Sequence, residues 1–217
     1  MKLHVTPGSP NCRKVEAALR HFGGTVSLEV IDIFAGTHKS PAYLALNPNG
    51  KLPILEDGDT VLWESNAILT YLFADKEGDS ASPGGRAQLC DRLRWLFWES
   101  AHYGRAVGDL VWERFAKPRF GLGETDAVRV ADATARFHQF APVLDGQLSD
   151  RPFVLGDAVS TVDFSLASQA ALIDAARVPY REYPHVAAWY DRLATVSAWR
   201  ETQPDFGTPD EAALQTA

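Results

Sequence analysis

The chain has 217 residues, of which 21 are Lys or Arg and 28 are Asp or Glu, so its formal net charge is −7. At about 150 residues per domain, this length corresponds to one or two domains. Hydrophobic residues make up 46% of the sequence and aromatic residues 11%, which is enough for a folded core and excludes a mainly disordered chain. The acidic balance excludes a typical nucleic-acid-binding protein, because such proteins need a concentrated basic face.

The sequence also lacks the features of an exported, membrane-spanning or zinc-binding protein. Residues 1–8 contain no apolar stretch of signal-peptide length, and no window approaches the roughly 18 apolar residues of a membrane span. Cys12 and Cys90 are too few for a disulfide framework or a four-ligand zinc site. We therefore expect a cytoplasmic protein with no metal ion and no membrane partner.

The beginning of the chain has the pattern of a strand-helix-strand unit. Residues 2–6 alternate in hydrophobicity as a short strand does, and Pro-Gly then breaks the pattern. A helix is expected from Pro10 to Phe22, because Ser9 can cap it, proline suits the first helical position and apolar residues recur at helical spacing. The β-branched segment 25–33 predicts a second strand, which such a unit places parallel to the first.

A hairpin and a second helix follow after a loop. Residues 53–56 and 60–63 flank the sequence DGD, which is typical of a β-hairpin, and helical spacing returns over residues 67–72. The first part of the chain therefore predicts a mixed sheet with helices packed against it. Residues 78–85, GDSASPGG, are small, polar and rich in turn formers, so they predict a linker.

The rest of the chain predicts only helices, separated by segments rich in Pro and Gly. Helical patterns cover residues 86–117, 128–148, 160–173 and 184–193. The PRFGLG segment from 118 to 123 is expected to end the first helix. The third helix opens on Ser160 with an acidic residue three positions later, Asp163, which is typical of a capping box.

Four short segments, in this order and at this spacing, carry a resemblance to a known family. They are SPNCR from Ser9, NPNGKLP from Asn47, ESNAI from Glu64 and the capping segment from Ser160. With the β-α-β-loop-β-β-α order of the first part, they make the chain resemble a cytosolic glutathione S-transferase of the bacterial type with a serine-type active site. The resemblance covers almost the whole chain. It implies an α/β plus all-α fold, with a thioredoxin-like glutathione-binding domain at 1–77 and an all-helical domain at 86–217.

Three residues around the start of the first helix are candidates for stabilising the glutathione thiolate. Ser9 ranks first, because serine-type transferases place a hydroxyl here and the helix N-terminus adds free N–H groups and a positive dipole. Asn11 ranks second, since its amide can also donate to a thiolate. Cys12 ranks third, because it keeps the second cysteine of a Cys-x-x-Cys redox motif but also suits a small buried position. The alternative for Ser9 is a helix cap that binds no ligand.

The resemblance places the cysteinyl part of glutathione against Leu52. In this superfamily the bond before the following proline, Pro53, is cis, and such a bond exposes the backbone of Leu52 so that an extended peptide pairs with it like an extra strand. Lys51 is expected to meet the glycine carboxylate, with His38 or Lys39 assisting it. A trans proline and ordinary solvated loop residues are the alternatives at these positions.

The γ-glutamyl end of glutathione is expected at the start of the next helix. Ser65 can present its hydroxyl and backbone N–H to the carboxylate, while Glu64 faces the ammonium group. A helix cap and a first-turn acid that bind nothing are the alternative. Members of the family often carry Arg after this pair in subunit contacts, and Asn66 departs from that pattern.

A hydrophobic electrophile is expected between the two domains, against the first long helix of the second. Tyr103 and Trp112 are chosen as the pocket residues from a larger set of rings, most of which we assign to the core. The other members of that set are Trp95, Trp98, His102 and Phe115.

The resemblance therefore implies a homodimeric transferase that uses reduced glutathione as its co-substrate and conjugates the thiolate to a small hydrophobic electrophile. Two alternatives stay open: a glutathione-dependent isomerase or dehalogenase, and a non-catalytic ligand-binding protein on the same fold. Product stoichiometry distinguishes the transferase from the isomerase, because conjugation consumes one glutathione and isomerisation consumes none. The peptide-anchoring set of Ser9, Leu52-Pro53 and Glu64-Ser65 favours an enzyme, since a scaffold has no need of it.

Overall fold

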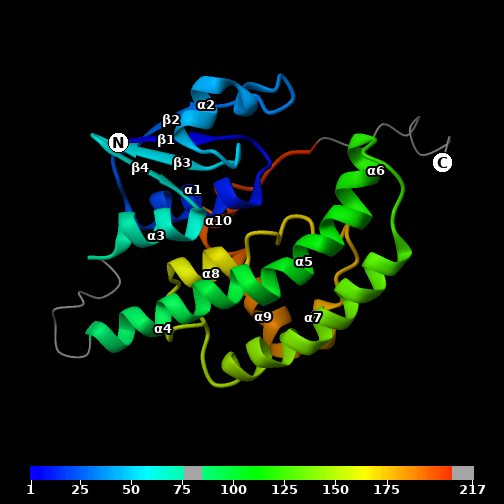
Figure 1. Cartoon of the computed structure of the whole chain (residues 1–217). Helices are drawn as coiled ribbons and strands as arrows, with labels where there is room; N and C mark the ends of the chain where they lie inside the picture. The colour runs from blue at the N-terminus through cyan, green and yellow to red at the C-terminus, as the bar shows by residue number, and fades with distance from the viewer. Residues whose placement is uncertain (76–84, 207–217) are drawn as a thin grey trace.

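The structure is a computed structural model that describes residues 1–75 and 85–206. Figure 1 shows a small sheet with its helices beside a larger group of helices made by the rest of the chain. The predicted fold, a thioredoxin-like α/β part followed by an all-helical part, is confirmed. The predicted linker lies outside the described residues except for Gly85, and the domain limits of 1–77 and 86–217 stay predictions.

The sheet has four strands in the order β2-β1-β3-β4. They are β1 (Lys2–Val5), β2 (Ser27–Val30), β3 (Ile54–Asp57) and β4 (Thr60–Trp63). The central strand β1 runs parallel to β2 and antiparallel to β3, with Leu3 opposite Leu28 on one side and Leu55 on the other. The parallel pair and the hairpin are thus confirmed, although β2 is shorter than the predicted 25–33.

Helices cover both faces of this sheet. On one face α1 (Pro10–Phe22) packs on α3 (Ser65–Phe73), and their apolar residues join Leu3 and Leu55 in the main core. On the other face α2 (Pro41–Leu46) follows the short 3₁₀ turn η1 (Thr37–Lys39) and buries Tyr43 against Ile31 and Ile54. The sequence predicted only a loop here, because a six-residue helix is too short to show a repeating apolar pattern.

One long helical rod begins the second part of the chain. It consists of α4 (Gly85–Trp98), α5 (Gly104–Val111) and α6 (Lys117–Phe120), joined by the π-helical turns η2 (Glu99–Tyr103) and η3 (Trp112–Ala116). The break predicted from Pro118 comes later, because proline is tolerated at the start of α6 and the helix continues to Gly121, whose φ is +64°. Then α7 (Ala127–Gln147) packs along α5.

Of the remaining helices, one is shorter than predicted, one has the predicted bounds and one was not predicted. The capping box opens α8 (Thr161–Leu166), but the helix stops at Leu166 instead of running through Ile173, because i to i+3 bonds such as Ala170 N–H to Ala167 C=O tighten the chain into turns. After the 3₁₀ turn η4 (Tyr180–Glu182) come α9 (Pro184–Leu193) and α10 (Ser197–Glu201). The helical pattern of the sequence predicts no helix after α9, so α10 was not predicted.

A buried polar cluster joins the two parts of the molecule. Lys14 on α1 is 1% exposed, and its ammonium group lies 3.4 Å from Glu99 Oε2, 3.0 Å from Asn66 Oδ1 and 3.2 Å from Ser165 Oγ. Asn66 Nδ2 in turn donates to Glu99 Oε2 at 2.9 Å. We refer to Lys14, Asn66, Glu99 and Ser165 as the interdomain network. Asn66, which departs from the family pattern, is therefore used inside the subunit.

None of the helices within residues 1–75 and 85–206 is both long enough and apolar enough to cross a bilayer.

Candidate active site

A cleft of about 910 Å³ lies between the sheet and the helical rod. One wall comes from the β1–α1 loop, the residues around η1 and the loop before β3, and the other comes from α5, η3, α6 and the segment after α10. The first wall brings together the predicted residues Ser9, His38, Lys51 and Leu52. The second is apolar and includes Val111, Trp112, Phe115, Phe120, Leu122 and Phe206.

Ser9 stands at the N-terminus of α1 and faces this cleft. Its Oγ accepts the Cys12 N–H at 3.4 Å, so Ser9 caps the helix as predicted, and its side chain is only partly buried. A hydroxyl that accepts from the backbone still has its own proton to donate. The cap and a contact with a thiolate are therefore compatible in one side chain.

The two rivals of Ser9 occupy different surroundings. Cys12 is fully buried beneath the helix, its Sγ accepts the Thr6 N–H at 3.4 Å, and burial raises the pKa of the thiol to about 11. Such a thiol stays protonated at neutral pH. Asn11 is exposed beside the cleft, and its Oδ1 accepts the Ser65 hydroxyl at 3.3 Å. The geometry thus favours Ser9 over Cys12 and brings Asn11 to the start of α3.

The backbone at Leu52 has the geometry that the sequence predicted. The Leu52–Pro53 bond is cis, Leu52 lines the cleft, and Pro53 is buried at the beginning of β3. Leu52 thus presents its main chain at the polar wall.

The basic residues of this wall come from two loops that touch each other. Lys51 is exposed in the cleft, and His38 lines it with an Nδ1 that is buried and has no hydrogen-bond partner among the described residues. Gly50 joins the loops, because a Cβ there would lie 2.8 Å from Lys39 Nζ and 3.0 Å from the His38 carbonyl oxygen. The exposed ammonium group of Lys51 in the cleft suits a carboxylate.

The start of α3 lies next to this polar region, although Glu64 and Ser65 are not among the residues that line the cleft. Glu64 has φ +70° and ψ 111°, a backbone conformation that costs a non-glycine residue about 1–3 kcal/mol. It turns the chain so that Ser65 begins α3 with free N–H groups at the positive end of the helix. Through the Ser65–Asn11 hydrogen bond this end lies next to α1.

Of the two residues predicted for the electrophile pocket, one lines the cleft and the other is buried in the helical core. Trp112 lines the cleft and is 44% exposed. Tyr103 does not reach it, which corrects the prediction: the side chain is fully buried, stacks on Trp98 with 5.6 Å between ring centroids, and its hydroxyl lies 3.2 Å from that of Tyr190. The η2 turn rotates Tyr103 into the helical core, and a sequence pattern with a period of 3.6 residues does not anticipate a π turn.

Comparison with known proteins bears on this arrangement. A family model described as glutathione S-transferase, N-terminal domain, matches residues 3–80, and one described as glutathione S-transferase, C-terminal domain, matches residues 127–192. Glutathione S-transferase 3 of Zea mays is 33% identical over 208 residues, which cover 93% of this chain and 92% of that protein. The chain belongs to the glutathione S-transferase family.

Solved structures agree with this assignment. The crystal structure of glutathione transferase F7 from Populus trichocarpa matches with a TM-score of 0.81 at 26% identity and covers 93% of this chain and 96% of its own. A theta class glutathione S-transferase from Xanthomonas axonopodis pv. citri, solved with glutathione bound, matches with a TM-score of 0.79 at 30% identity and the same coverage of both chains. The comparisons therefore support glutathione S-transferase activity, while the bacterial and serine-type details stay predictions.

Several residues of the transferase cleft were not predicted. Phe34 follows β2 and Phe120 ends α6, and their rings lie 5.9 Å apart across the mouth of the cleft. Phe206 lies in the segment after α10 and packs on Phe115 at 5.4 Å between ring centroids. Single phenylalanines in loops or at the end of a short helix carry no periodic signal, so only the fold could bring these rings together.

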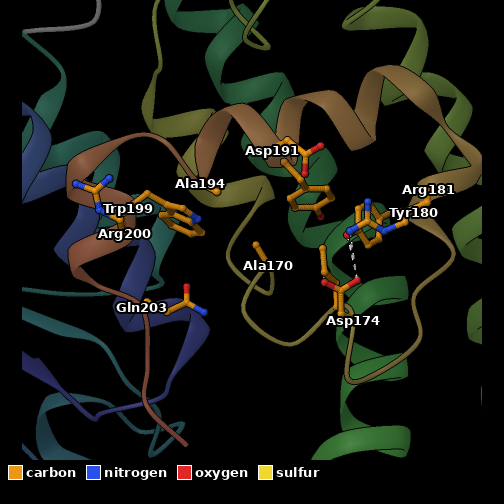
Figure 2. Close-up of a pocket in the computed structure, with 11 residues that line it drawn as sticks. Ala170, Asp174, Tyr180, Arg181, Asp191, Ala194, Trp199, Arg200 and Gln203 are labelled. Atoms are coloured by element: carbon orange, nitrogen blue, oxygen red, sulfur yellow. Dashed lines mark hydrogen bonds and ion pairs between the residues drawn. The ribbon is translucent and has the colours of Figure 1, made fainter.

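A second cavity, of about 350 Å³, lies within the helical part of the transferase (Figure 2). Aromatic rings of Tyr190 and Trp199 line it, and Figure 2 shows the Tyr180 hydroxyl directed at Asp174, to which it donates at 3.0 Å. Its lining contains none of the residues predicted to bind glutathione, so we place the active site in the larger cleft. Across the described ranges, no group of three or more His, Cys, Asp or Glu is arranged to hold a metal ion.

Proposed function

We propose that this transferase binds reduced glutathione along the polar wall of the cleft, stabilises its thiolate with the Ser9 hydroxyl and transfers it to a hydrophobic electrophile on the apolar wall. The observation that carries the proposal is that one cleft holds Ser9, Leu52 and the basic residues on one side and aromatic rings on the other.

In this proposal, glutathione lies along the polar wall with its glycine end at the basic loops and its γ-glutamyl end at the start of α3. Its cysteinyl part pairs with the backbone of Leu52, and its glycine carboxylate meets Lys51 and His38, which both line the cleft. Its γ-glutamyl carboxylate lies at the N-terminus of α3, where the Ser65 hydroxyl donates to it in place of Asn11 Oδ1. Glu64 faces the ammonium group of the same γ-glutamyl residue. This orientation directs the sulfur to Ser9.

The energy needed to form the thiolate is within reach of this site. A free thiol has a pKa of about 8.5, and lowering it by two units takes about 2.7 kcal/mol. A hydrogen bond to a charged acceptor supplies roughly 1.5–3 kcal/mol, and a helix N-terminus adds roughly 0.3–1 kcal/mol. The Ser9 hydroxyl and α1 together are therefore sufficient without a metal ion or a redox group.

The reaction is then a nucleophilic substitution or conjugate addition. The thiolate sulfur forms the new carbon–sulfur bond, and either a leaving group departs with its electron pair or a proton is taken up at the adjacent carbon. Trp112 and the phenylalanines of the apolar wall hold the electrophile, so catalysis comes from positioning and thiolate stabilisation.

A stoichiometry experiment tests the proposal and separates it from its alternatives. Purified protein is incubated with glutathione and chlorodinitrobenzene, and glutathione loss, thioether product and chloride are counted. We expect one glutathione consumed for each thioether and chloride formed. An isomerase would leave glutathione unconsumed with its own substrate, and a ligand-binding protein would bind glutathione in calorimetry without turnover. Absence of glutathione binding would refute the proposal altogether.

The proposal includes a homodimer, as the family resemblance implies. Large apolar side chains are exposed on β4, α3 and α4: Val61 is 37% exposed, Trp63 40%, Tyr71 45% and Phe97 70%. A cluster of such residues on adjoining elements suits a contact with a second copy of the chain.

A further inference from the structure

The segment after α10 returns to the cleft and brings Phe206 close to the proposed catalytic serine. Figure 1 shows this orange-to-red segment running from α10 past the beginning of α1. Phe206 lines the cleft together with Gly8 and Ser9. A residue near the end of the described chain is thus part of the site formed by the β1–α1 loop.

Two contacts of Phe206 and two hydrogen bonds at the root of its segment fix its position. Its ring packs edge to face on Phe115, with 5.4 Å between centroids and 68° between planes. Its carbonyl oxygen accepts from Arg119 Nη2 at 2.9 Å. At the root of the segment, the buried Arg13 donates to the Trp199 carbonyl oxygen at 3.0 Å and to Gln203 Oε1 at 2.8 Å. The ring is therefore held on the helical wall of the cleft, and the segment that carries it is anchored to α1.

Gly8 allows the ring to approach the backbone beside Ser9. A Cβ at Gly8 would lie 3.0 Å from Phe206 Cε1, and the φ of +78° already favours glycine there. The ring edge therefore packs on the residue next to the proposed thiolate partner. By contrast, the outer mouth is open, because Phe34 is 81% exposed and Phe120 is 41% exposed.

We infer that Phe206 is a specificity-determining residue that limits the width of the electrophile at the glutathione sulfur. Single-ring aromatic electrophiles fit in the cleft beside the Phe206 ring, whereas wider fused-ring electrophiles meet that ring at the reacting carbon. This inference rests on the proposed function, because it takes the sulfur to lie at Ser9. A well-packed ring gives selectivity of about tenfold or more between ligands that do and do not fit.

Binding of two product analogues tests this inference without depending on turnover. S-benzylglutathione and S-(anthracenylmethyl)glutathione are titrated by calorimetry into the wild type, Phe206→Ala and Phe206→Tyr, with Phe34→Ala as the matched control at the outer mouth. We expect the wild type, Phe206→Tyr and Phe34→Ala to prefer the benzyl compound by at least about tenfold. In Phe206→Ala this preference should fall to about threefold or less.

Glutathione itself is the reference ligand in each variant. Unchanged glutathione affinity in Phe206→Ala shows that the polar wall and the fold are intact. The inference is overturned if Phe206→Ala keeps the wild-type preference, or if Phe34→Ala loses it to the same extent. Failure of the wild type to bind glutathione would instead refute the proposed function.

Discussion

At the residue scale, Cys12 and Ser9 on the same helix differ in burial. The Cys12 thiol lies beneath α1, where the low dielectric raises its pKa to about 11, while Ser9 stands one turn earlier at the exposed end of the same helix. A ligand thiolate bound at Ser9 would lie near solvent and near the positive N-terminal end of α1, and both stabilise its negative charge. In the proposed function, the chain therefore presents the Ser9 hydroxyl to the thiol of glutathione, whereas the buried Cys12 thiol belongs to the core.

The Ser65 hydroxyl is predicted to bind the γ-glutamyl carboxylate. Ser65→Ala removes a hydrogen bond to a charged group, which costs roughly 1.5–3 kcal/mol and corresponds to about a ten- to hundredfold loss of glutathione affinity. Calorimetry measures this loss directly. Ser27→Ala, on an exposed edge of the sheet, is the matched control and should leave the affinity unchanged. Equal glutathione affinities in the two variants would show that the start of α3 does not bind glutathione.

At the element scale, a single buried carboxylate organises the start of α8. Asp163 is fully buried and accepts four hydrogen bonds, from the Ser160 N–H and hydroxyl, the Val154 N–H and the Trp189 indole N–H, at 2.7–3.0 Å. It thereby ties the helix cap to the preceding turn and to α9. The capping box predicted from Ser160 and Asp163 is confirmed, and it does more than begin a helix.

Asp163→Asn should therefore destabilise the protein strongly. An amide cannot accept all four donors and places its own N–H₂ against some of them, so we expect a loss of at least about 3 kcal/mol in the free energy of unfolding. Denaturant unfolding monitored by tryptophan fluorescence measures it. Asp157→Asn, at an exposed position a few residues away, should stay within about 0.5 kcal/mol of the wild type. Similar midpoints for both variants would contradict this role of Asp163.

The elements that could be predicted from the sequence are those with a strong local signal. Ser9 and Pro10 mark the start of α1, the DGD turn marks the hairpin, and the apolar pattern of α7 extends over many turns. Short elements such as α2 and α10 give too few repeats, and the turns after Leu166 keep apolar residues at helical spacing without forming a helix. Local pattern therefore predicts the existence of long elements better than their ends.

The candidate site was predictable in its polar half and not in its apolar half. Ser9, Lys51 and Leu52 belong to short segments whose residue types carry the family resemblance, and the structure gathers them at the cleft. Which aromatic rings join them depends on helix rotation and on long-range packing. Tyr103 turns inward at η2, and Phe206 arrives from the far end of the described chain.

At the scale of the whole molecule, the interdomain network couples the sheet to the helices. Lys14→Met should cost about 3–5 kcal/mol of unfolding free energy, because it leaves the buried Glu99 carboxylate without its cation. Adding Glu99→Gln removes the unpaired charge and should recover about half of that loss. Denaturant unfolding of both single variants and the double variant measures the coupling. Additive effects of the two substitutions would show that Lys14 and Glu99 act independently.

The exposed apolar side chains of β4 and α4 are predicted to form the subunit interface. Wild-type protein should elute as a dimer in size-exclusion chromatography with light scattering, and Phe97→Glu should shift it to a monomer, because a buried unpaired charge opposes association. Val128→Glu, at a position 78% exposed on α7, is the control and should remain dimeric. A monomeric wild type would refute the homodimer.

The most direct test of the account is the ionisation of glutathione bound to the Ser9→Ala variant. The thiolate absorbance of the complex is titrated against pH in the wild type, Ser9→Ala, Asn11→Ala and Cys12→Ala, after thermal unfolding confirms that each is folded. We predict that Ser9→Ala raises the pKa of the bound thiol by at least about one unit, equivalent to about 1.4 kcal/mol, with glutathione affinity nearly unchanged. An unmoved titration in folded Ser9→Ala, together with a shift in Asn11→Ala or Cys12→Ala, would contradict the assignment of Ser9 as the thiolate partner.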